Sequence, residues 1–203
     1  MNTEFIKTYH LIKNDILRLA FSYTRNISDA EDITQEVFTK LYENFNDFED
    51  IEYIKKWCIK VTINKCKNLF LSSWNKKVLF FTDNNENKIP DIGNMTKENT
   101  EVLDTLLNMP KKYRIVLVLY YYEEYKIKEI SEILKISEST IQTRLQRGRE
   151  QLKKLLMGVK KMNIKRKLND ALEQIEASDE LDKRVMNSTI YKEQKKCHLV
   201  NIN

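Results

Sequence analysis

Glycine and proline are scarce in this sequence of 203 residues, which contains 3 glycines and 2 prolines. Phosphate-binding loops, dinucleotide-binding fingerprints and the tight turns of β-sandwiches and barrels all depend on glycine. The shortage therefore excludes most nucleotide-dependent enzymes and most all-β folds. We predict an almost entirely helical protein, and the length is sufficient for one or two domains.

Cysteine and histidine are also rare. The 3 cysteines, Cys58, Cys66 and Cys197, show no C-x-x-C spacing, and with only 2 histidines they form no recognisable zinc site. The acidic cluster at residues 29–36 lacks the Glu-x-x-His partners of metal sites in helical bundles, which argues against an enzyme. We expect no metal and no other cofactor.

Long hydrophobic runs are absent too. The longest apolar stretch, Ile115–Tyr122, is far too short to cross a bilayer. An odd number of cysteines suits a reducing compartment. The sequence therefore predicts a cytoplasmic protein with no membrane insertion.

Charge is abundant and strongly segregated, although the net charge is only +5. Residues 51–77 carry +6 and residues 138–167 carry +8, whereas residues 1–50 carry −5. Two short basic segments in an otherwise acidic chain indicate two contacts with a polyanion such as nucleic acid. Ordinary solvated lysine faces would give the same charges, so composition alone leaves both interpretations open.

Three helices are predicted in the first 74 residues. Apolar residues spaced by three or four run from Phe5 to Tyr23, and a second helix is expected to open at Ser28, with Glu31 completing a capping box. A third helix is expected from about residue 51 to residue 74. One face of this helix combines an aromatic ring and an amide with lysines and has no carboxylate: Trp57, Lys60, Asn64 and Lys67. Such a face suits contact with a nucleic-acid backbone and unstacked bases; alternatively, Trp57 covers the edge of the core and the lysines are merely solvated.

The second half of the chain predicts a helix-turn-helix. Residues 75–97 lose helical periodicity and are expected to form a linker. Helices are then expected at Lys126–Leu134 and Glu138–Leu156, the latter capped by Ser137. The last helix turns hydrogen-bonding and cationic side chains outward, of the kinds that read the major groove and bind phosphates: Gln142, Thr143, Gln146, Arg147 and Arg149. An ordinary helical hairpin is the alternative.

Two segments resemble a known family. Residues 19–38 read LAFSYTRNISDAEDITQEVF and are similar to conserved region 2 of bacterial sigma-70-type factors. Residues 127–149 read IKEISEILKISESTIQTRLQRGR and are similar to region 4. Because both regions occur in order, with nothing equivalent to regions 1.1 or 3, the chain resembles the extracytoplasmic-function (ECF) subfamily.

The resemblance implies an all-α protein with two small helical domains joined by a flexible linker: region 2 at residues 1–74, the linker at 75–97 and region 4 at 98–157. It implies no enzymatic activity. Instead, such a protein binds the RNA polymerase core through the β′ clamp helices and the β flap, reads the −35 and −10 promoter elements and assists melting. An anti-sigma factor is expected as a further partner. A helix-turn-helix regulator that binds DNA without core polymerase is the alternative.

The resemblance also assigns site residues by position. Contact with core polymerase is expected from Asp32, Gln35 and Glu36. Contact with the −10 element is expected from Phe48, Trp57, Lys60, Asn64 and Lys67. The −35 element is expected to meet Gln142, Thr143, Gln146 and Arg147, with Arg144 and Arg149 near phosphates.

Residues 158–203, the C-terminal extension, lie outside the family's pattern. A helix opening at Met162 would place Leu168, Leu172 and Ile175 on one face, and a second helix is suggested by residues 176–185. A partly disordered extension is the alternative. The segment is faintly similar to the cytoplasmic opening segment of membrane anti-sigma factors, and if it is autoinhibitory, truncation after Met157 should raise transcription.

Overall fold

The computed structural model describes residues 3–48, 50–77, 95–155 and 164–200, and every regular element in them is helical. The first part of the chain forms α1 (Thr3–Thr24), α2 (Ile27–Glu43), the short 3₁₀ turn η1 (Phe45–Asp47) and α3 (Ile51–Lys77). The second part forms α4 (Lys97–Asn108), α5 (Lys111–Leu117), the π-helical turn η2 (Val118–Tyr122), α6 (Ile127–Leu134) and α7 (Glu138–Leu155). The extension forms α8 (Ile164–Leu172) and α9 (Asp179–Val200). The all-α expectation is confirmed for these residues.

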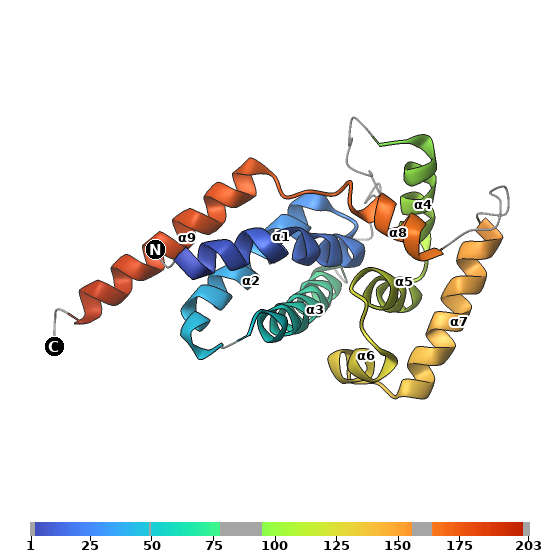
Figure 1. Ribbon diagram of the computed structural model, residues 1–203, viewed down its shortest axis with the longest axis horizontal. Coiled ribbons are helices and arrows are strands. Elements are labelled where there is room, and N and C mark those ends of the chain that lie inside the picture. Colours follow the sequence, from blue (N-terminus) through green and yellow to red (C-terminus); the bar gives the residue numbers. More distant parts are fainter. Residues whose placement is uncertain (1–2, 49, 78–94, 156–163, 201–203) are drawn as a thin grey trace.

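Helices α1, α2 and α3 form the first bundle (Figure 1). The predicted apolar stripe of α1 is confirmed, because Phe5, Tyr9, Ile16 and Leu19 are completely buried. The helix ends where Arg25 takes a left-handed conformation with φ 59°, and the Arg25 amide donates to the Phe21 carbonyl at 2.8 Å. This closing turn sends the chain back along α1 as α2.

The predicted capping box at Ser28 and Glu31 is wrong. Helix α2 is capped by Asn26, whose extended backbone lets its Oδ1 accept from the Asp29 amide at 3.0 Å. Asparagine caps a helix N-terminus as well as serine does, so the earlier residue takes the position and Ser28 falls inside the first turn. Glu31 is then free to contact α9 instead of its own helix end.

Helices α4 to α7 form the second bundle, with α5 at its centre. Ile115, Val116, Val118 and Leu119 are buried. The predicted cap of the last helix is confirmed, because the Ser137 Oγ accepts from the amide of residue 140 at 3.3 Å. Helices α6 and α7 thus form the expected helix-turn-helix, which packs on α5 through α7.

A polar network joins the two bundles. The Lys55 ammonium on α3 lies 2.6 Å from Asp15 Oδ2 on α1 and 3.0 Å from Glu123 Oε2 at the end of η2. Burial disfavours the ammonium, but the carboxylates of Glu123 and Asp15 outweigh it and raise the pKa of Lys55. Burial in turn raises the pKa of Glu123 to about 7, although the Lys55 charge opposes the shift. The two bundles therefore lie in contact with each other.

The C-terminal extension is helical where the structure describes it. Helix α8 packs on α4 and η2, and α9 packs along α2, so the two helices lie on different bundles (Figure 1). Leu168, Leu172 and Ile175, the predicted face of the first tail helix, are buried. Among the described helices, none is both long and apolar enough to cross a membrane.

Candidate nucleic-acid interface

The basic face of α3 is open to solvent. Lys60, Asn64 and Lys67 are exposed and recur at intervals of four and three residues, so they lie on one side of the helix. The opposite side is buried through Cys58, Ile59 and neighbouring residues. This places the two lysines and the amide where an extended nucleic-acid strand could pass along the helix.

An aromatic cluster lies at the start of this face. Trp57 and Phe48 are half-buried, and their rings meet edge to face with centroids 5.4 Å apart. The Lys40 ammonium lies 6.0 Å from the centre of the Trp57 ring, and Tyr53 lies 5.8 Å from Phe48 with 63% of its surface exposed. Trp57 therefore covers the edge of the core and also belongs to an accessible aromatic and cationic surface.

Tyr53 and Lys40 were missed by the sequence analysis. Tyr53 precedes Trp57 by four residues, one helical turn, so the periodicity of α3 was the signal that could have found it. Lys40 comes from α2, and its approach to Trp57 depends on how the two helices cross. No local pattern could have predicted that contact.

The acidic residues expected to contact polymerase lie on the outer side of α2. Asp32 and Glu36 are exposed and Gln35 is half-buried. Glu36 pairs with Lys65 of α3, and Asp32 accepts from Arg184 of α9 at 2.6 Å. These residues share one surface, but part of it is in contact with the extension.

Helix α7 presents a broad polar arc. Gln142, Thr143, Gln146 and Arg147 are exposed, while Ile141, Leu145 and Leu152 face the core. At 100° per residue, Arg144 and Arg149 fall at opposite borders of the arc. The structure thus brings all six predicted residues onto one continuous surface.

The two border arginines have different surroundings. The Arg149 Nε donates to the Tyr121 hydroxyl at 2.7 Å, and its guanidinium lies 5.3 Å from the centre of the Tyr120 ring. Arg144 instead lies at a hollow on the other border. Arg149 is therefore held in place by tyrosines of η2, which orients it beside the arc.

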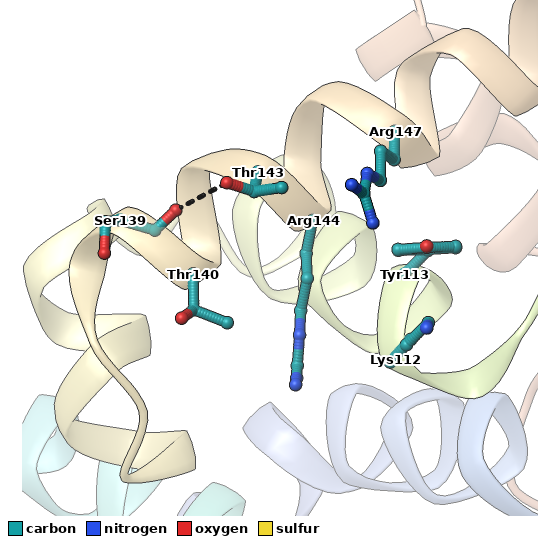
Figure 2. Close-up of a pocket in the computed structure, with 7 residues that line it drawn as sticks. All are labelled: Lys112, Tyr113, Ser139, Thr140, Thr143, Arg144 and Arg147. Atoms are coloured by element: carbon teal, nitrogen blue, oxygen red, sulfur yellow. Dashed lines mark hydrogen bonds between the residues drawn. The ribbon is translucent and has the colours of Figure 1, made fainter.

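The hollow beside Arg144 is a cationic cavity of about 270 Å³. Figure 2 shows Arg144 and Arg147 from α7 facing Lys112 and Tyr113 at the start of α5. A hydrogen bond from Arg147 lowers the pKa of the Tyr113 hydroxyl. Three cations and no carboxylate line this cavity, which is the arrangement expected for a phosphate contact. Lys112 was not among the predicted site residues, because it lies on α5, outside the helix-turn-helix that the sequence indicated.

The described residues contain no group of three or more histidine, cysteine, aspartate or glutamate side chains that could hold a metal ion. Cys58 and Cys66 are buried and not paired in a disulfide. Burial raises the pKa of each thiol to about 12, so both are poor nucleophiles and poor metal ligands.

Models of known protein families match the sequences of both bundles. The family model for sigma-70 region 2 matches residues 8–76, and the model for sigma-70 region 4 matches residues 99–152. RNA polymerase sigma factor SigZ of Bacillus subtilis is 34% identical over 136 residues, covering 64% of this chain and 74% of the relative. The chain belongs to the sigma-70 family. A second relative, the ECF RNA polymerase sigma factor SigW of Bacillus subtilis, is 29% identical over 168 residues, covering 75% of this chain and 88% of the relative.

The names of the relatives identify the subfamily as ECF. Solved structures share the fold. The sigma factor RpoE in complex with the anti-sigma factor NepR, from Bartonella quintana, has a TM-score of 0.58 at 19% identity and covers 77% of this chain and 98% of that chain. CnrH in complex with the cytosolic domain of CnrY has a TM-score of 0.51, also at 19% identity, over 76% of this chain and 88% of that one.

The family matches divide this sigma factor along its bundles. Region 2 corresponds to α1–α3, and region 4 corresponds to α4–α7. Neither match includes α8 or α9. The extension therefore lies outside the two matched regions.

Proposed function

We propose that this protein is a non-catalytic specificity subunit that binds the RNA polymerase core and directs transcription initiation at particular promoters. The observation that carries the proposal is the presence of two cationic surfaces of different chemistry on regions 2 and 4, beside an acidic surface on α2. A regulator that only bound duplex DNA would need the α7 surface alone.

Region 2 supplies the polymerase and −10 contacts in this proposal. Asp32, Gln35 and Glu36 contact the β′ clamp helices, which must offer cations to match these side chains. Opening the −10 element requires unpairing and unstacking of bases, at a cost of a few kcal/mol for a flipped base. The Phe48–Trp57 cluster offsets part of this cost by stacking, worth about 1–3 kcal/mol per base.

The remaining −10 contacts follow the exposed face of α3. Lys60 and Lys67 attract the backbone of the separated strand, and Asn64 lies between them with an amide that can hydrogen-bond to a base edge. These groups fit a strand whose bases are unpaired and turned toward the protein.

Region 4 supplies the −35 contacts and docks on the β flap. Its arc fits the major groove of duplex DNA, where glutamine amides pair with adenine and arginine pairs with guanine. Gln142, Gln146 and Arg147 have these chemistries, and Arg144 and Arg149 border them as phosphate contacts.

An anti-sigma factor is part of the proposal as a regulatory partner. One solved structure with this fold is a sigma factor, RpoE, in complex with the anti-sigma factor NepR, and another is CnrH in complex with the cytosolic domain of CnrY. The acidic surface of α2 offers such a partner a direct route to inhibition, because its occupant would prevent polymerase from binding.

The decisive experiment is run-off transcription with Bacillus subtilis core polymerase on a library of AT-rich promoters, with and without the protein. Initiation that depends on the protein is expected, and sequencing of the templates yields the −35 and −10 elements together. In parallel, promoter DNA is titrated with the free protein and with holoenzyme, and only holoenzyme should bind tightly.

The control is the same protein with Asp32→Arg and Glu36→Arg. These changes reverse the charge of the α2 surface and leave α7 intact, so core binding should be lost while weak duplex binding persists. Equal promoter affinity with and without core would contradict the proposal and favour a regulator that acts without polymerase.

A further inference from the structure

Helix α9 lies on the acidic surface of α2. The Arg184 guanidinium donates from Nη1 to Asp32 Oδ1 at 2.6 Å and from Nη2 to Glu31 Oε2 at 3.0 Å. Asp32 is one of the residues proposed above to contact polymerase. Because Arg184 already occupies this carboxylate, a polymerase cation has to displace it to make the same contact.

The contact continues along both helices. The hydroxyl oxygens of Thr39 on α2 and Ser188 on α9 lie 2.9 Å apart, and Lys192 pairs with Glu43 one turn further on. Between these polar contacts, α9 buries Leu181, Val185 and Thr189, which are spaced by four residues. A buried stripe flanked by matched polar pairs fixes one register of α9 on α2.

The beginning of α9 is anchored on α1. Asp182 accepts from the Tyr9 hydroxyl at 2.6 Å and from the Lys13 ammonium at 2.7 Å. Burial opposes ionisation of Asp182, but these hydrogen bonds outweigh it and lower the pKa of the carboxyl. Asp182 is therefore ionised at neutral pH and holds α9 against region 2.

The connection between α8 and α9 is held by a buried arginine. Arg18 of α1 donates to the carbonyls of Ile175 and Glu173, both at 2.8 Å. The Asn14 Oδ1 accepts from the Ala177 amide at 2.9 Å. A buried guanidinium that uses main-chain carbonyls of the extension as acceptors indicates a specific binding site for this connection.

Helix α8 extends the contact to region 4. Leu168 and Leu172 are buried, and the Lys165 ammonium lies 2.6 Å from Glu124 Oε1. Asn99 of α4 donates to the Asp170 carbonyl at 3.3 Å. The extension thus holds regions 2 and 4 in one arrangement while α9 covers part of α2 (Figure 1).

We propose that residues 164–200 are a built-in competitor of the polymerase core, which binds α2 only after α9 has left it. Arg184 places a positive charge on the acidic surface, and polymerase must offer a positive charge to bind the same carboxylates. Since α9 is tethered, its effective concentration is high. The apparent affinity for core is then the intrinsic affinity multiplied by the fraction of molecules in which α9 is displaced. This inference rests on the proposed function.

The first test locks α9 in place in the full chain. Thr39→Cys and Ser188→Cys are introduced together with Cys197→Ser, so that oxidation joins α9 to α2 through one engineered disulfide. Binding of Bacillus subtilis core is then measured for the oxidised and the reduced forms. We expect at least tenfold weaker binding when oxidised and recovery of wild-type affinity on reduction; the Thr39→Cys single variant should not respond to oxidant.

The second test loosens α9 by charge. Arg184→Glu sets a third carboxylate against Glu31 and Asp32, and we expect about tenfold tighter core binding than wild type. Lys183→Glu is the matched control, because it makes the same charge change one residue away at an exposed position. It should bind core as wild type does.

The outcomes separate the two proposals. Core binding that is indifferent to the lock, failure of the disulfide to form, or equal affinities for the Arg184→Glu and Lys183→Glu variants would overturn the built-in competitor and leave the sigma function standing. Absence of core binding in every variant, including reduced protein and Arg184→Glu, would overturn the sigma function and the competitor with it.

Discussion

The two cationic surfaces of this protein differ in what accompanies the charge. On α3 the lysines lie beside a tryptophan, a phenylalanine and an exposed tyrosine. On α7 the arginines lie beside glutamine and threonine on a helix whose opposite side is buried. Aromatic rings provide stacking for unpaired bases, whereas amides and guanidinium groups provide hydrogen bonds to paired ones. One chain therefore has separate chemistry for a melted and for a duplex element.

The largest expected effect on these surfaces comes from Trp57→Ala, tested in the holoenzyme. Loss of a stacking platform should weaken binding of a single-stranded −10 oligonucleotide by about tenfold to a hundredfold, in line with stacking energies of about 1–3 kcal/mol per base. Binding of a duplex −35 fragment should not change. Trp57→Phe is the control that keeps a ring, and equal losses on both DNAs would show that Trp57 acts only through the stability of region 2.

The converse change is Arg147→Ala, which should have the opposite selectivity. A bidentate contact to a base is worth about 1–3 kcal/mol, so duplex −35 binding should fall about tenfold while the single-stranded oligonucleotide binds as before. Fluorescence anisotropy of both DNAs measures the two effects. Arg147→Lys keeps the charge but not the planar fork, and full recovery by lysine would point to a phosphate contact instead of a base contact.

The buried and exposed sides of the helices that carry these surfaces were largely predictable from the sequence, because they depend on helical periodicity. The apolar stripe of α1, the Ser137 cap and the outward arc of α7 each follow from spacings within one helix. Gly148 lies on the opposite side of α7 from the arc, and a Cβ there would lie 3.0 Å from the buried Leu117 side chain. Local patterns therefore predicted which side of each helix meets the other helices.

What the sequence could not predict depends on pairing between distant helices. Asn26 and Ser28 are both good caps, and the choice between them follows from where α1 ends at Arg25. Arg184 could pair with any of many carboxylates, and the register of α9 on α2 selects Glu31 and Asp32. Such contacts require the register between two helices, which no single segment encodes.

The contact between regions 2 and 4 through Glu123 should make the free energy of unfolding depend on pH. Burial raises the pKa of Glu123 to about 7. Because the pKa of Glu123 is higher in the folded than in the unfolded protein, the folded protein binds the proton more tightly. The stabilisation by neutral Glu123 is therefore complete below the unfolded pKa and is lost as the pH rises through 7. Between pH 6 and pH 8 the free energy of unfolding should fall by about 1 kcal/mol more in wild type than in Glu123→Gln.

Urea denaturation of both proteins at the two pH values measures this difference. The variant serves as its own reference, because all other titrating groups are common to the two chains. An identical pH dependence in wild type and Glu123→Gln would show that Glu123 ionises normally, and that Lys55 fully compensates its burial.

The dependence of −10 binding on salt should change only slightly when one lysine of α3 is replaced. If Lys60 and Lys67 each neutralise one phosphate of a single strand, Lys60→Gln or Lys67→Gln should lower the slope of log affinity against log salt by about 0.7. Lys128 is also exposed but lies on α6, so Lys128→Gln should leave the slope for the −10 oligonucleotide unchanged. The slopes come from titrations of holoenzyme at several salt concentrations. A slope that changes equally in all three variants would mean that binding of the strand depends on the net charge of the protein. In that case α3 would not provide a defined path for the melted strand.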